Sequence, residues 1–141
     1  MKTKIKKKKK YQLNQLLKRQ KKKKKKKIIK KEQIESSLKQ IQSTLPKDLG
    51  SGVTYVQARY EKDSRTIVFG YTVEGITEPF PPDALDVLKQ VTLLSLNDPS
   101  VAADPIWKLA AKAHATFRYE YCLPDGSPAG SYSLSKREYA R

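Results

Sequence analysis

Residues 53–73, VTYVQARYEKDSRTIVFGYTV, decide the fold, because polar and apolar side chains alternate in two runs separated by a short polar connector. In the first run, Val56, Ala58 and Tyr60 fall on one face and Tyr55 falls on the other. In the second run, four side chains share a face: Ile67, Phe69, Tyr71 and Val73. The connector is too short for a crossover, so the pattern predicts an antiparallel hairpin.

A second pair of strands is predicted near the C-terminus, at residues 116–123 and about 130–137. The segment between them, Pro124-Asp125-Gly126-Ser127-Pro128, is rich in residues that favour turns. Because the connection is short, we expect these strands to form another antiparallel hairpin.

Aromatic and charged side chains alternate along the strand at residues 116–123. Phe117, Tyr119 and Tyr121 share one face, and Arg118 and Glu120 lie on the other. Exposed aromatic residues could stack on unpaired bases. Charged side chains need water, however, so we expect the aromatic face to pack beneath helices.

Three helices are predicted, at residues 32–45, 83–95 and about 105–113. In the first, Ile34, Leu38, Ile41 and Leu45 recur at spacings of four, three and four. The second has Ala84, Leu85, Leu88, Val91 and Thr92 at helical spacing. Asp104-Pro105 has the composition of a helix start. Asn97-Asp98-Pro99-Ser100 is interpreted as a loop.

The predicted order is therefore helix, strand, strand, helix, helix, strand, strand (α-β-β-α-α-β-β). Each element has one apolar side to bury, which predicts an α+β domain with a four-stranded antiparallel sheet and helices on one face. Residues 32–141, about 110 in number, suffice for a single domain.

Residues 1–31 are predicted to be a disordered, lysine-rich tail. They contain eighteen Lys or Arg residues and no acidic residue, whereas residues 32–141 contain twelve basic and fourteen acidic residues. The net charge of +16 thus divides into +18 for the tail and −2 for the domain. A block of like charges repels itself, stays solvated and attracts polyanions.

We therefore predict a non-enzymatic interaction module whose tail binds RNA or DNA backbone without sequence specificity, since lysine offers little bidentate readout of bases. The predicted polyanion-binding residues are Lys6, Lys7, Lys8, Lys9, Lys10, Lys18, Arg19, Lys21, Lys22, Lys23, Lys24, Lys25, Lys26, Lys27, Lys30 and Lys31. The alternative is a peripheral membrane or envelope-associated domain that binds a protein partner, with the tail on anionic lipid. A tail without any partner, or one produced by an upstream start codon, is the third interpretation.

Catalytic chemistry is not indicated by the sequence. His114 and Cys122 are the only residues of their types, and even on one strand they would lie roughly 26 Å apart, too far for a nucleophile and its base. Most acidic residues fall in turns or at helix starts, where carboxylates cap backbone amides. We predict no metal and no cofactor, because no Cys/His cluster and no glycine-rich phosphate loop is present.

The sequence contains no signal-peptide hydrophobic region, which predicts a cytoplasmic protein, or an extracytoplasmic one if the true N-terminus differs. Lys18-Arg19-Gln20-Lys21 resembles a nuclear-localisation signal, relevant in a eukaryotic source.

A family resemblance covers about residues 33–139. Leu45-Pro46, the hairpin from Val53, and Tyr119-Glu120-Tyr121 with Pro124-Asp125-Gly126 resemble small bacterial α+β domains of unknown function. Those domains often lie outside the inner membrane behind an N-terminal anchor, and they typically contain a pair of cysteines. The resemblance implies an extracytoplasmic setting and no activity.

Overall fold

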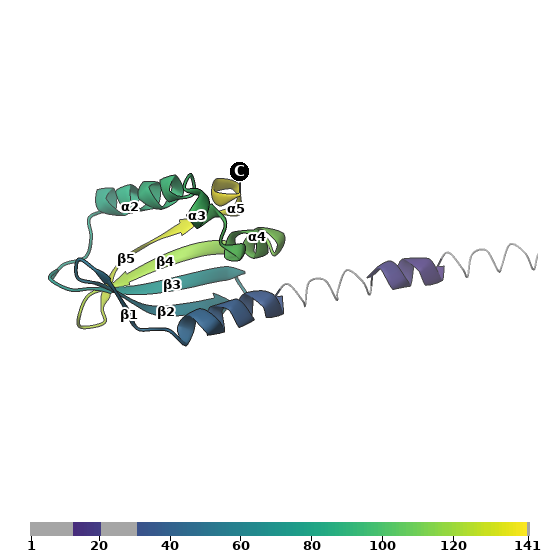
Figure 1. Ribbon diagram of the computed structural model, residues 1–141, viewed down its shortest axis with the longest axis horizontal. Coiled ribbons are helices and arrows are strands. Elements are labelled where there is room, and N and C mark those ends of the chain that lie inside the picture. The colour runs from purple at the N-terminus through teal and green to yellow at the C-terminus, as the bar shows by residue number, and fades with distance from the viewer. Residues whose placement is uncertain (1–12, 21–30, 141) are drawn as a thin grey trace, which may run out of the picture.

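The computed structural model of the protein describes residues 13–20 and 31–140 (Figure 1). Residues 13–20 and 31–42 are helical. The other elements are β1 (Lys47–Gly50), β2 (Val53–Glu61), β3 (Thr66–Val73), α2 (Pro82–Ser95), α3 (Pro99–Ala102), α4 (Pro105–Lys112), β4 (Thr116–Cys122), β5 (Pro128–Leu134) and α5 (Lys136–Tyr139).

The sheet has five strands in the order β1-β2-β3-β4-β5, and β3 and β4 pair in parallel. The predicted four-stranded antiparallel sheet is therefore wrong, although the α+β class and both predicted hairpins are correct. The chain leaves the end of β3, and α2, α3 and α4 return it to the edge where β3 began. Accordingly, the Thr116 amide donates to the Arg65 carbonyl at 2.9 Å, and β4 starts beside the start of β3.

The strand that the prediction missed, β1, has four exposed residues and therefore lacks alternating burial. It pairs with β2 through a turn in which Gly50, Ser51 and Gly52 all have positive φ. A bulge follows in β2 between Tyr55 and Gln57. The extra residue places Tyr55 on the same face as Ala58 and Tyr60, which corrects the predicted alternation.

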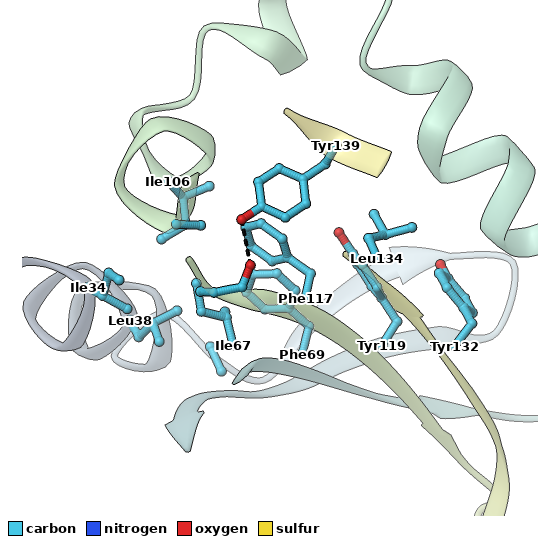
Figure 2. Packing of buried hydrophobic residues seen from close by; sticks show 13 residues of the cluster. Ile34, Leu38, Ile67, Phe69, Ile106, Phe117, Tyr119, Tyr132, Leu134 and Tyr139 are labelled. Atoms are coloured by element: carbon cyan, nitrogen blue, oxygen red, sulfur yellow. Dashed lines mark hydrogen bonds between the residues drawn. The ribbon is translucent and has the colours of Figure 1, made fainter. Parts of the chain in front are cut away.

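Helices cover one face of the sheet, and the core lies between the two layers (Figures 1 and 2). Ile34 and Leu38 from residues 31–42, and Ile106 and Ala110 from α4, pack onto the sheet. The strand residues that they cover include Ile67, Phe69, Phe117 and Tyr119. The predicted burial of the aromatic face is thus confirmed.

Charged and polar residues occupy the opposite face of the sheet. Arg59, Arg118 and Ser133 lie in one row across β2 to β5 and flank Val68, an apolar residue that is fully buried between them. Both arginines approach the Glu120 carboxylate, at 3.5 and 3.4 Å. The ion pairs of Arg59 and Arg118 with Glu120 lie at the surface of this face, so this face does not need a second helical layer.

The predicted second and third helices correspond to α2 and α4. The predicted loop at residues 97–100 is wrong in part, because the Asp98 carboxylate accepts from the Ser100 amide and caps α3. The last predicted strand ends at Leu134, where Ser135 and Glu138 form a capping box that starts α5. The boundary predicted at residue 31 stays a prediction, since most of the tail lies outside the described residues.

Candidate protein-docking site

A stripe of exposed apolar side chains runs along the outer side of α2. Val87, Val91 and Leu94 follow one another at spacings of four and three and are 61%, 57% and 64% exposed. This spacing places the three side chains on one side of a helix. We call these three residues the α2 stripe.

The inner side of α2 is attached to the sheet without any fully buried residue. Leu85 and Leu88 are partly buried against the core, and the Thr92 hydroxyl lies 2.7 Å from that of Tyr132. The predicted helix counted Val91 among the residues of its apolar side, which is wrong, because Val91 belongs to the outer stripe. The helix predicted at residues 83–95 has apolar residues on both its inner and its outer side. The prediction did not use this signal in the sequence.

A hollow of about 400 Å³ continues from the end of the α2 stripe. Leu94 belongs to both, and the other apolar lining residues include Leu96, Trp107 and Tyr139. Trp107 is fixed in place, because its Nε1 donates to the Val101 carbonyl at 3.1 Å and its ring packs on Phe117. Gln90, Asn97 and Glu138 also line the hollow, so the apolar stripe continues into a hollow of mixed polar and apolar character.

The charged residues of α2 and of the hollow lining are acidic or paired. Asp83 and Asp86 are exposed on α2 and take part in none of the ion pairs found among the described residues. Glu138, at the wall of the hollow, accepts from Lys89 at 2.8 Å. The Lys89 ammonium, helped by the Ser135 amide, lowers the pKa of the Glu138 carboxyl below its ordinary value. A complementary ligand is therefore apolar and basic.

The two lone candidates for nucleophilic chemistry are kept apart. His114 follows α4, where its Nδ1 accepts from the Lys136 ammonium at 3.1 Å. Cys122 is the last residue of β4 and so lies at the other end of that strand. Their predicted separation is confirmed.

Acidic residues predicted to cap backbone amides do so at several turns. The Asp104 carboxylate accepts from the Ile106 amide at 3.0 Å, and the Asp125 carboxylate accepts from Ser127 through its amide and its hydroxyl. The Ser127 hydroxyl and amide lower the pKa of Asp125. Within residues 13–20 and 31–140, no group of three or more His, Cys, Asp or Glu residues could hold a metal ion.

Two of the three aromatic residues considered as a platform for bases are buried beneath the helices. Phe117 is fully buried and Tyr119 is 8% exposed, so neither ring offers a free face to a nucleotide, whereas Tyr121 is only partly buried. Of the predicted polyanion-binding residues, Lys18, Arg19 and Lys31 lie within the described ranges and are exposed. The others lie outside these ranges, and the role of the whole set stays a prediction.

Three solved structures share the fold. The pilotin EpsS of the Vibrio vulnificus type 2 secretion system has a TM-score of 0.58 at 8% identity, over 82% of this chain and 96% of its own. The type II secretion pilotin AspS of Vibrio cholerae gives 0.51 at 11% identity, over 81% and 95%. A Pseudomonas aeruginosa protein provisionally classed as secreted gives 0.56 at 11% identity, over 81% and 96%.

No protein-family model and no curated protein matches the sequence. The chain therefore has the fold of small bacterial α+β proteins, in line with the resemblance inferred from its motifs. In the parts of the chain described here, no helix is both long and apolar enough to cross a membrane.

Two predictions are corrected by these neighbours. A nucleic-acid-binding module is contradicted, because two of the structures are secretion-system pilotins, and the protein-binding, envelope-associated alternative agrees with them better. The predicted cytoplasmic location is contradicted as well, since all three neighbours belong to secretion or are classed as secreted. The charge of the tail dominated the first prediction, although charge alone does not distinguish between polyanions, and the second rested on the lack of a signal-peptide hydrophobic region.

Proposed function

We propose that this protein is a non-enzymatic, envelope-associated module that binds a helix of a partner protein on the α2 stripe and the adjoining hollow. The observation that carries the proposal is the exposure of Val87, Val91 and Leu94, each more than half exposed on a helix packed on a folded domain. Exposed apolar side chains gathered into a patch are typical of protein-interaction sites.

The shape and charge of the site favour an amphipathic helix as the ligand. A helix lying along α2 would bury its own apolar residues against the stripe and place one anchor in the hollow beside Trp107. Basic residues at the border of that helix would face Asp83 and Asp86. The fold shared with two pilotins supports a role in assembling a protein complex, and not a catalytic one.

Site-specific photo-crosslinking in the source cells tests the proposal. A photoreactive residue at Val91 should form one discrete adduct with a second protein in the envelope fraction. The matched control carries the same residue at Ser133, exposed on the opposite face of the sheet. Equal adducts from both positions, or a protein that fractionates wholly with the cytosol, would refute the proposal.

The triple variant V87S/V91S/L94S tests whether binding of the partner depends on the apolar side chains of the α2 stripe. Because these side chains are exposed, we expect the free energy of unfolding to change by less than about 1 kcal/mol. The crosslink from a photoreactive residue at Gln90, which lines the hollow, should be lost in the same variant. A persistent crosslink would assign the contact to other residues.

A further inference from the structure

A second exposed apolar stripe lies far from α2 in the sequence, on the helical segment at residues 13–20. Leu13, Leu16 and Leu17 are 58%, 55% and 49% exposed. Their spacing of three and one places them on a single side of the helix, and Gln15 falls on the opposite side. We call these leucines the leucine stripe.

Lysine blocks flank this segment in the sequence on both sides, at residues 6–10 and 21–27. The segment itself adds Lys18 and Arg19, both exposed, and no acidic residue occurs before Glu32. An apolar stripe bordered by many basic residues is the composition of helices that lie in the interface of an anionic membrane. The phospholipid headgroups attract the lysines, and the acyl chains accept the leucines.

We propose that residues 13–20 lie on an anionic membrane surface with the leucine stripe inserted among the lipids. A nucleic acid would attract the lysines equally well but would leave the three leucines in water, so the leucines favour the membrane. This attachment uses residues outside the α2 stripe. It therefore stands or fails independently of the protein-docking proposal.

Vesicle binding by the full chain tests the proposal. The variant L13S/L16S/L17S should bind vesicles of phosphatidylcholine and phosphatidylglycerol about tenfold more weakly than the wild type at physiological ionic strength. The matched control V87S/V91S/L94S removes the same number of exposed apolar side chains and should bind within about twofold of the wild type. Pure phosphatidylcholine vesicles should bind the wild type weakly.

An environment-sensitive dye locates the inserted side. In a C122S background, a dye at L16C should shift its emission to the blue on anionic vesicles, and a dye at Q15C should shift much less. Equal affinity of the leucine variant and the wild type, without a shift at position 16, would mean that the lysines act alone and would overturn the proposal. Loss of binding to RNA but not to vesicles in the leucine variant would overturn it too.

Discussion

Two tyrosine hydroxyl groups near the core have opposite surroundings. The Tyr139 hydroxyl donates to the carbonyl of Ala115 at 2.6 Å, in a buried contact between α5 and the start of β4 (Figure 2). The hydroxyl of Tyr60 is buried too but has no hydrogen-bond partner among the described residues. Removing the hydroxyl group should therefore change the free energy of unfolding differently at these two positions, because only Tyr139 loses a hydrogen bond.

The substitution Tyr139→Phe should lower the free energy of unfolding by about 1–2 kcal/mol, because the Ala115 carbonyl loses its donor. The matched substitution Tyr60→Phe should be neutral or stabilising, since it removes a polar atom that lacks a partner. Urea denaturation of both variants measures the difference. A destabilised Y60F would show that its hydroxyl has a partner after all.

Alkaline pH should also act through the tyrosines of the core. Burial raises the pKa of Tyr55, Tyr71, Tyr119 and Tyr121, and it raises that of Tyr139 to about 12. The unfolded chain loses these protons near pH 10, so this contribution to stability is present below about pH 10 and falls as the pH rises above it. Tyrosinate absorbance of this group should therefore appear together with the loss of helical circular dichroism. Tyrosinate formation by all of them in a still folded domain would contradict the expectation.

At the scale of elements, α2 is the least embedded of the longer helices. It contains no fully buried residue, whereas α4, with fewer residues, buries Ile106 and Ala110. One side of α2 contacts β5 and the other side carries the α2 stripe. Its position therefore depends on a few contacts with β5, among them the Thr92–Tyr132 contact and the close approach of Leu85 to Gly130.

The substitution Gly130→Ala should displace α2. Gly130 has a φ of +149°, and a methyl group there would lie 2.9 Å from both terminal carbons of Leu85. Backbone strain and overpacking should together lower the free energy of unfolding by about 1–3 kcal/mol.

The double variant G130A/L85A controls for this contact. Shortening Leu85 makes room for the methyl group at position 130. In denaturation experiments, the double variant should therefore lose less free energy of unfolding than the two single variants lose in total. Strict additivity would mean that the strained backbone alone accounts for the loss.

At the scale of the molecule, the helical layer is assembled from distant parts of the chain. Residues 31–42 lie over one end of the sheet near β2, and α2 lies near β5 (Figure 1). Ile34 and Leu38 are 0% and 2% exposed, so the helical segment at residues 31–42 belongs to the core. Lys62 pairs with Glu35 at 3.1 Å and links the segment to the β2–β3 turn.

Truncation should distinguish tail from core. A chain of residues 32–141 should keep the melting temperature of the full protein within a few degrees, because the side chains that pack begin at Ile34. A chain of residues 47–141 should fail to unfold cooperatively, since loss of two buried aliphatic side chains costs about 4–10 kcal/mol of a typical 5–15 kcal/mol. Calorimetry measures both. A stable 47–141 fragment would place the boundary after this helix.

Much of the fold was predictable because its signals are local. Alternation at residues 66–73, helical spacing from Ile34 and the capping pair Asp104-Pro105 each act within a few residues. The bulge after Tyr55 was not predictable in this way, because it depends on how two strands align. The capping box of α5 was present in the sequence, but the alternation before it was extended too far.

The sequence by itself determined the α+β class, both hairpins, the burial of the aromatic strand face and the unequal distribution of charge. Only the tertiary structure decided that β3 and β4 are parallel, because that depends on the direction in which α2 to α4 cross the sheet. It also decided the candidate site. Helical spacing identifies the apolar sides of α2, but which of them meets the sheet and which stays exposed depends on packing against β5, whose residues lie about forty positions away, as in the Thr92–Tyr132 contact.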